Sequence, residues 1–454
     1  MKDVSDQVNS EEIVGIKGYS TSTAPIDGQI KNDIADFIVR EIIPSGEILN
    51  TREKSENDYS FDKKKDRYTS FTLIKKNTDT IFAAKVIAEY LHIYDTEVLW
   101  AGIKDNTAIT AQRMMVPGNQ IERLKQFKAK NLTITNIQPS RKPIEIGSLW
   151  GNNFEINIRK TTQSFDELKS ILAEWNTQVQ ANGFPNFYGL QRFGQYRPNS
   201  HNVGRLLFLG KYQEAYEEFL FKVYPEEYKP IKEFRKLLAS NPPISELKDW
   251  PTPLSYEKQI YDGLQKSNGN YAQAFQYLPK ALLNLIFSSY QSYLFNRVIS
   301  YRLKQKDPLG SPVKGDIVGI LMEKRGLPSL VCYQYGGWND ESINKAFEHE
   351  RGTILAPILG YKTNLSLYPY FEKTYQEILK EENFSQEQFQ NGFTGYFNYE
   401  GTFRPIFQKP TNLMISQAYI LNEYPNKDPN GIKVEFSLPK GTYATMLLRE
   451  LMKN

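Results

Sequence analysis

Residues 101–112 read Ala-Gly-Ile-Lys-Asp-Asn-Thr-Ala-Ile-Thr-Ala-Gln, and the rest of the chain is interpreted outward from this stretch. It follows Val98-Leu99-Trp100, a short apolar run that predicts the end of a buried strand. Gly102 would let the backbone turn, and Lys104 with Asp105 would place a cation and a carboxylate at the tip of a loop. On these residues alone, Asp105 could serve only to bond its own backbone.

Strands and helices alternate around this loop, from about residue 29 to 185. Alternating apolar residues predict strands within 29–43, 68–74, 132–134 and 154–158. Residues 77–79 and 164–167 carry helix N-cap patterns, and Gly183 is well placed to end the second helix. Thr51–Arg67 is dense in charge and predicts an excursion between two strands. This pattern predicts a mixed α/β or α+β domain.

After Gly183 the composition of the sequence changes, and arginines lie among aromatic residues and glycines. Residues 186–194 read Asn-Phe-Tyr-Gly-Leu-Gln-Arg-Phe-Gly and continue to Arg197. Arginines among aromatic residues could grip a phosphate backbone and stack on bases, or they could pack at a domain boundary; both interpretations are open here. Residues 206–303 are mostly helical in pattern, residues 308–410 favour short strands, and a strand at 434–438 precedes a final helix.

The amino-acid composition limits the classes of protein to which this chain can belong. A chain of 454 residues predicts two domains or more, and its net charge of +4 permits an RNA partner without requiring one. One cysteine and three scattered histidines argue against disulfides and metal sites. We find no apolar run long enough to span a membrane, and Met1–Glu12 is polar and acidic, unlike a signal sequence. We therefore expect a cytoplasmic protein.

Three further stretches, besides the central loop, carry motifs that can be compared with those of known families. Residues 147–154 read Gly-Ser-Leu-Trp-Gly-Asn-Asn-Phe, residues 186–194 are quoted above, and residues 438–445 read Leu-Pro-Lys-Gly-Thr-Tyr-Ala-Thr. In this order, the four stretches resemble the motifs of the TruD family of RNA pseudouridine synthases. Leu190 stands where bacterial members usually carry Glu, and the residues from Arg197 to Gly204 are closer to the archaeal and eukaryotic branch.

The resemblance implies an architecture. It implies an α+β fold, with a pseudouridine-synthase catalytic domain on a mixed or antiparallel sheet and an inserted α+β TRUD domain. The catalytic domain would be split in sequence, with residues 1–185 as its first segment and residues 408–454 as its closing segment. Residues 186–407 would form the inserted domain.

The resemblance also implies the site residues. Asp105 would be the catalytic carboxylate and Lys31 its cationic partner, whereas composition alone would make Lys31 a solvated lysine. Lys104 is the second choice of partner, with phosphate contact or simple solvation as its other interpretations. Phe154 would stack on the target base or, alternatively, be a core residue of its strand.

The remaining candidates would contact RNA. Asn152 would hydrogen-bond near the flipped nucleotide or stabilise the Asp105 loop, and Arg192 and Arg197 would contact the RNA backbone. A uridine in folded RNA must be extruded from its stack to reach Asp105, which costs a few kcal/mol.

The implied reaction is the isomerisation of a uridine in tRNA, position 13 in the family at large, to pseudouridine. It needs no cofactor and no metal, and the expected partner is tRNA, with the protein itself a monomer. Two alternative functions are a synthase that acts mainly on another RNA site and a non-catalytic RNA-binding or chaperone module with the same fold. A binding module has no chemical need for Asp105, and a methyltransferase would want a glycine-rich cofactor loop, of which we find none.

Overall fold

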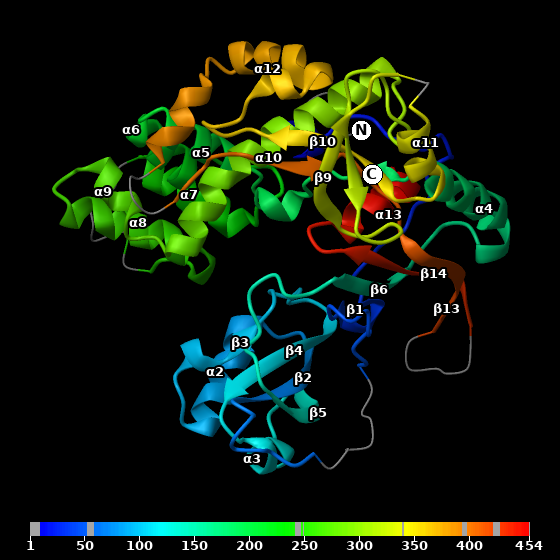
Figure 1. Cartoon of the computed structure of the whole chain (residues 1–454). Coiled ribbons are helices and arrows are strands. Elements are labelled where there is room, and N and C mark those ends of the chain that lie inside the picture. The colour runs from blue at the N-terminus through cyan, green and yellow to red at the C-terminus, as the bar shows by residue number, and fades with distance from the viewer. Residues whose placement is uncertain are drawn as a thin grey trace. The chain divides into compact units, whose positions relative to one another are not determined.

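The computed structural model describes residues 10–51, 59–240, 247, 249–337, 340–392, 397–420 and 427–453 (Figure 1). The chain forms two compact units. Unit 1 contains residues 1–20, 185–320 and 328–407, and unit 2 contains residues 21–184, 321–327 and 408–454. Among the described residues, no helix is both long and apolar enough to cross a membrane.

Unit 2 is built on one large mixed sheet. Its strand order is β13-β14-β6-β1-β4-β2-β5, and β3 also pairs with β4. β1 runs parallel to β4, whereas the pairs β1–β6, β6–β14, β13–β14, β2–β4 and β2–β5 are antiparallel. The strands are β1 (Phe37–Ile42), β2 (Tyr68–Lys76), β3 (Leu99–Trp100), β4 (Ile109–Pro117), β5 (Leu132–Ser140), β6 (Gly151–Ile158), β13 (Thr411–Tyr419) and β14 (Lys427–Pro439). The mixed sheet confirms the predicted α+β class.

The helices of unit 2 begin where the sequence predicted them. Asp79 caps α2 (Thr80–Leu91), and Ser164 forms a capping box with Glu167 at the start of α4 (Phe165–Asn182). Gly183 follows the last residue of α4 with a positive φ of 72°. α2 buries its alanines and Ile87 in a core with residues of β2 and β4. The other helices are α3 (Ile121–Lys125) and α13 (Ala444–Met452).

Unit 1 surrounds one long helix. α10 (Lys280–Gln305) packs against α5 (Ser200–Phe208), α12 (Pro369–Glu381) and β10 (Gly352–Ile358), as Figure 1 also shows. β10 is paired in the order β11-β10-β8-β9, and β7 (Phe184–Pro185) pairs with β12 (Phe407–Gln408). The other elements are α1 (Ser10–Ile13), α6 (Tyr212–Leu220), α7 (Lys229–Ala239), α8 (Ser255–Lys266), α9 (Tyr271–Phe275), α11 (Glu341–Glu348), β8 (Ile317–Leu321), β9 (Pro328–Gln334) and β11 (Thr402–Pro405).

The structure differs from the sequence predictions in two places: the grouping of the chain segments and the elements within residues 308–410. Residues 1–20 belong to unit 1, although the predicted catalytic segment 1–185 includes them. Residues 321–327 belong to unit 2, although the predicted inserted domain 186–407 includes them. Residues 308–410 contain α11 and α12 besides short strands. The prediction of short strands overlooked a helical signal, since Phe371, Tyr375 and Ile378 of α12 recur at helical spacing and are buried. Residues 52–58 of the predicted excursion, and residues 1–9 of the polar start, lie outside the described residues.

Gly151 is a position where the sheet requires glycine. A Cβ at Gly151 would lie 2.0 Å from the carbonyl oxygen of Leu438 on the neighbouring β14. We predict that Gly151→Ala lowers the free energy of unfolding by about 1–3 kcal/mol, because the strands must separate to admit the methyl group. Urea unfolding measures the change. Gly336→Ala is the matched control, since nothing lies within 4 Å of its Cβ, and equal stability of the two variants would contradict the prediction.

Candidate active site

One face of the unit 2 sheet gathers polar and aromatic side chains from five neighbouring strands. The strand register places Lys75 beside Thr110, Val39 beside Thr110 and Phe154, and Phe154 beside Phe436. Because side chains alternate along a strand, Glu41, Gln112 and Asn152 also share this face. α2 covers part of the same face over β2 and β4. The loop 101–108 enters β4 beside the N-terminus of α2.

Asp105 and Lys31 meet at this face. The Nζ of Lys31 donates a hydrogen bond of 3.1 Å to the Oδ1 of Asp105. The side chain of Asp105 is 38% exposed and that of Lys31 is 26% exposed. The carboxylate is therefore paired with a cation, yet it remains accessible to a ligand. This geometry excludes the interpretations of Lys31 as a solvated lysine and of Asp105 as a side chain bonded only to its own backbone.

Lys31 is held in an uncommon conformation. Its φ is +58°, a left-handed value that few non-glycine residues adopt. Its Nζ also lies 4.2 Å from the centroid of the Phe37 ring, at the start of β1. The ammonium group is thus fixed between an aromatic face and the carboxylate of Asp105. Strained backbone of this kind clusters at functional sites.

A second lysine, Lys75 of β2, holds the backbone of the loop. Its Nζ donates hydrogen bonds to the carbonyl oxygens of Asp105, at 2.5 Å, and of Lys104, at 3.4 Å. Lys75 has no exposed surface. Burial lowers the pKa of Lys75 from 10.5 to about 8, and the nearby negative charge of Asp105 opposes this shift. The loop therefore depends on a buried cation bonded to two of its carbonyl groups.

The N-terminus of α2 supports the same loop. The hydroxyl oxygen of Thr80 accepts a hydrogen bond of 3.2 Å from the backbone N–H of Lys104. The Thr80 hydroxyl also lies 3.3 Å from the Oε1 of Gln112, and the Nε2 of Gln112 lies 3.5 Å from the carbonyl oxygen of Gly102. Thr80 and Gln112 are both fully buried. Side-chain hydrogen bonds thus replace regular secondary structure in this loop.

Lys104 points away from Asp105 and into the protein. Its Nζ pairs with the Oε2 of Glu41 at 2.8 Å, and the two side chains are 4% and 0% exposed. A buried lysine paired with a buried carboxylate is a structural element, because the pair anchors the loop to β1. The interpretation of Lys104 as a solvated lysine is wrong. Its position gives no support to the predicted substrate contact, or to Lys104 as the partner of Asp105.

Two phenylalanines stack next to the site. The ring centroids of Phe154 and Phe436 are 5.4 Å apart with an angle of 27° between the planes, and Phe37 meets Phe154 edge to face at 6.4 Å. Phe154 is 5% exposed, as a core residue would be. Asn152 lies two residues before Phe154 on β6, and its buried Oδ1 has no hydrogen-bond partner among the described residues. A buried acceptor without a partner is uncommon and calls for an explanation.

Arg192 and Arg197 belong to unit 1 and are both engaged there. Arg192 donates hydrogen bonds to the hydroxyls of Ser292 and Ser288 on α10. Arg197 is 12% exposed, donates to the carbonyl oxygen of Glu218, and lies near the carboxylates of Glu227 and Glu257. Burial lowers the pKa of Arg197 to about 10. These contacts favour the interpretation of Arg197 as a packing residue over that of a phosphate ligand.

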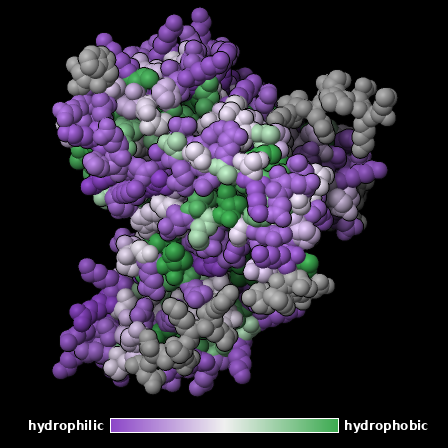
Figure 2. Space-filling view, turned by 90° about the vertical axis from the view of Figure 1, so that its right-hand side faces the viewer, coloured by the Kyte–Doolittle hydropathy of each residue, from purple (hydrophilic) through white to green (hydrophobic). Residues whose placement is uncertain are grey.

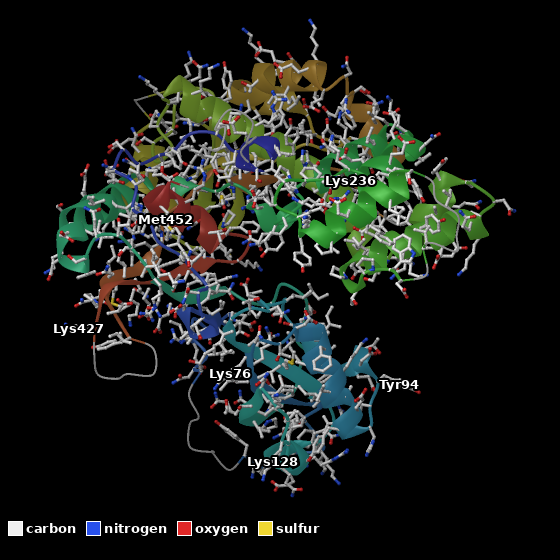
Figure 3. The ribbon with its side chains drawn as sticks, turned by 180° about the vertical axis from the view of Figure 1, so that it is seen from behind. Lys76, Tyr94, Lys128, Lys236, Lys427 and Met452 are labelled. Atoms are coloured by element: carbon white, nitrogen blue, oxygen red, sulfur yellow. The ribbon has the colours of Figure 1, made fainter. Side chains whose placement is uncertain are left out.

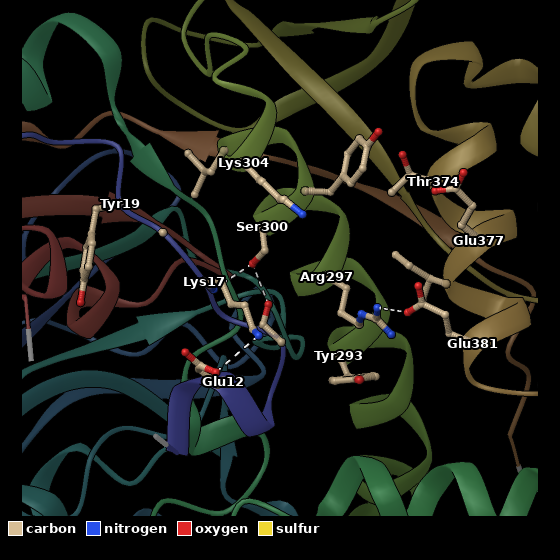
Figure 4. Close-up of a pocket in the computed structure, with 15 residues that line it drawn as sticks. Glu12, Lys17, Tyr19, Tyr293, Arg297, Ser300, Lys304, Thr374, Glu377 and Glu381 are labelled. Carbon is tan, nitrogen blue, oxygen red and sulfur yellow. Dashed lines mark hydrogen bonds and ion pairs between the residues drawn. The ribbon is translucent and has the colours of Figure 1, made fainter. Parts of the chain in front are cut away.

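A cavity of about 820 Å³ lies elsewhere, in unit 1, between the N-terminal segment, α10 and α12 (Figure 4). Its charged groups largely neutralise one another: Lys17 pairs with Glu12 at 3.4 Å, and Arg297 pairs with Glu381. Ser300 bridges the backbone of Gly15 and Lys17. These bonds fasten the N-terminal segment to α10. The described residues contain no group of three or more His, Cys, Asp or Glu able to hold a metal ion.

An accessible aspartate paired with a lysine, beside stacked aromatic rings on a mixed sheet, defines a candidate carboxylate-dependent enzyme that acts on a planar base. The comparisons identify the family. A family model described as tRNA pseudouridine synthase D (TruD) matches residues 13–451. The chain belongs to the TruD family, as the four motifs predicted.

Relatives match over nearly the full length. A probable tRNA pseudouridine synthase D of Methanosarcina barkeri is 30% identical over 448 residues, which is 98% of this chain and 97% of the relative. One of Pyrococcus furiosus is 31% identical over 449 residues, covering 98% of this chain and 100% of the relative. The crystal structure of a putative tRNA pseudouridine synthase D from Methanosarcina mazei superposes with a TM-score of 0.75 and 28% identity, covering 98% of each chain.

Sequence reasoning missed several residues that build the site. The predicted strand 68–74 ended before Lys75, Thr80 was not singled out, and Phe436 was predicted only as part of a strand. The alternation within β14 contains a signal, since Phe436 follows Ile432 and Val434 on a buried face. Burial in β2 gives no such signal, because both of its faces are buried from Thr69 to Lys75. The partners of Lys75 and Phe436 could not be derived, because the pairing of distant strands sets them.

The charge of Asp105 should be measurable at Lys75. We predict that Asp105→Asn lowers the pKa of Lys75 further below 10.5, because the largest electrostatic influence that raises it is removed. NMR titration of the lysine Cε resonances measures this pKa. Asp95→Asn, which changes an exposed carboxylate of the same unit, should leave it as it is. An unchanged pKa in Asp105→Asn would contradict the described geometry.

Proposed function

We propose that this chain is a tRNA pseudouridine synthase, an isomerase, in which the carboxylate of Asp105 carries the reaction on a uridine extruded from tRNA. The observation that carries the proposal is the ion pair of 3.1 Å between Lys31 and an accessible Asp105, in a chain that matches the TruD family over residues 13–451. The target is the uridine at position 13 of tRNA.

The reaction conserves every atom of the nucleotide. The bond between uracil N1 and ribose C1′ breaks, the base turns, and a bond forms between C5 and C1′. The proton leaves C5, and N1 ends protonated. Asp105 would act either by attacking C1′ or by removing a proton from the sugar, and both roles require an ionised carboxylate. No oxidant, metal or cofactor enters this balance.

Lys31 would hold the carboxylate of Asp105 in place while substrate displaces water, because the two groups form an ion pair of 3.1 Å. Since Phe37 and the left-handed backbone hold Lys31 in place, the cation does not have to be reorganised when RNA binds. Lys75 would contribute through the backbone alone, because its ammonium group binds carbonyl oxygens of the loop.

Phe154 and Asn152 would receive the extruded base. Stacking on an aromatic ring offsets part of the cost of removing a base from its stack. Phe154, which stacks on Phe436, would provide this ring after a small displacement of the side chains that cover it. The unpartnered Oδ1 of Asn152 would accept a hydrogen bond from the uracil.

Contacts with the RNA backbone are assigned to Arg192 within this proposal. Among the described residues its guanidinium group donates to neutral serine hydroxyls and lies 5.7 Å from the centroid of the Tyr188 ring, without a paired carboxylate, so its charge could be used by a phosphate. Arg197 is left out because its guanidinium group is buried among carboxylates. The protein would act as a monomer in the cytoplasm.

The first test maps pseudouridine at nucleotide resolution in unmodified tRNA transcripts incubated without cofactor. We predict product at position 13 with the wild-type protein, and a loss of rate on the order of 1,000-fold or more in Asp105→Asn, since the reacting group is absent. Asp95→Asn should behave as wild type. Product formed by Asp105→Asn at the wild-type rate would refute the assignment, and binding without product would favour a binding module.

The second test addresses Lys31. We predict that Lys31→Met lowers the single-turnover rate by about 10- to 100-fold, whereas Lys31→Arg retains more activity because it keeps the charge. Lys130→Met, which removes an exposed lysine of the same unit, controls for the loss of one positive charge in RNA binding. Equal rates for Lys31→Met and Lys130→Met would contradict the role of Lys31.

A further inference from the structure

Three large apolar side chains stand exposed beside the Asp105 loop. Ile81 is 46% exposed, Phe82 is 59% exposed, and Ile103 is 65% exposed. Much of the molecular surface that Figure 2 presents is hydrophilic, with hydrophobic residues confined to patches. Apolar side chains gathered at one place on such a surface indicate a binding surface.

A hydrogen bond places the backbone positions of these residues near one another. Ile81 and Phe82 directly follow Thr80 at the start of α2, and Ile103 directly precedes Lys104 in the loop. Thr80 and Lys104 are hydrogen-bonded to each other. Side chains of a helix lean toward its N-terminus, so Ile81 and Phe82 lean toward the loop. We call Ile81, Phe82, Gly102 and Ile103 the apolar patch.

The first turn of α2 is also rigid. The carboxylate of Asp79 accepts hydrogen bonds from the backbone N–H groups of Ile81, at 2.8 Å, and of Phe82, at 3.0 Å. The two apolar side chains therefore project from a fixed backbone, although nothing described covers them. A rigid exposed aromatic side chain loses little conformational entropy on binding.

Gly102 supplies an independent observation. We expected its freedom to make a turn, but its φ is not in the left-handed region, and a Cβ there would have nothing within 4 Å. Neither the backbone nor the packing of the described residues requires glycine at this position. The space in front of Gly102 is open, which allows a flat ligand to approach the backbone next to Ile103.

We propose that the apolar patch contacts the faces of the nucleobases that neighbour the extruded uridine. This inference rests on the proposed function, since it follows from extrusion at Asp105. Removing a base from a stack exposes the faces of its neighbours, and Phe82 and Ile103 offer apolar surface beside the carboxylate that the extruded nucleotide must reach. Lys85, exposed one helical turn after Ile81, adds a cation for the adjoining phosphate.

The test compares Phe82→Ala and Ile103→Ala with wild type on tRNA, using kcat/KM for pseudouridine formation. Each should fall, and Phe82→Ala by roughly 5- to 150-fold, the range that stacking on an aromatic ring supports. Tyr94→Ala is the matched control: Tyr94 is 78% exposed and projects outward beyond the other end of α2, as Figure 3 shows, and its loss should change little. Urea unfolding confirms that the variants remain folded, since neither side chain is buried.

A second set of substrates separates base contact from a general defect. A tRNA with an abasic site next to the target uridine should already be a poor substrate for the wild-type protein. On this RNA, Phe82→Ala or Ile103→Ala should cost much less than on intact tRNA, because the partner base is gone. Equal losses on both RNAs, or no loss on either, would overturn the inference.

The failure of the proposed function looks different. If wild-type protein forms no pseudouridine in any tRNA, the proposed function fails, and the inference that rests on it is overturned with it. If wild-type protein forms pseudouridine and Asp105→Asn does not, while Phe82→Ala and Ile103→Ala match Tyr94→Ala, the function stands and the apolar patch has no role in base contact.

Discussion

The hydrogen bonds from Lys75 to the carbonyl oxygens of Lys104 and Asp105 are the interaction on which the site depends. The loop between β3 and β4 has no regular secondary structure, so its carbonyl groups must find partners elsewhere. A buried ammonium group on the adjacent β2 satisfies two of them at once. The cost of burying this charge is visible in the lowered pKa of Lys75, and the negative charge of Asp105 offsets part of it.

Three lysines around one loop thus have three separate partners. Lys31 pairs with the carboxylate of Asp105, Lys75 binds backbone carbonyls, and Lys104 pairs with Glu41. Only the first pair is substantially exposed. The two buried cations fix the loop, whereas the exposed one faces the place where substrate would bind. A single sheet face, crossed by β14, β6, β1, β4 and β2, positions all of these groups together with the stacked phenylalanines.

Much of this could be predicted from the sequence where it depends on residues close together in the chain. The α+β class and the caps at Asp79 and Ser164 depend on short-range patterns and are confirmed. The pair of Lys31 and Asp105 came from the family motifs. The burial of Lys104 and the role of Lys75 were not predicted, because they depend on the register between strands far apart in sequence. Helices α11 and α12 were not predicted, although the residues that α12 buries recur at helical spacing.

A structure of Asp105→Asn bound to its substrate tRNA would test the central claim most directly. The account predicts that the target uridine is extruded, that its uracil lies against Phe154 and Asn152, and that its C1′ faces residue 105 beside Lys31. A target uridine still stacked in the tRNA, or one bound in the unit 1 cavity between α10 and α12, would contradict the account.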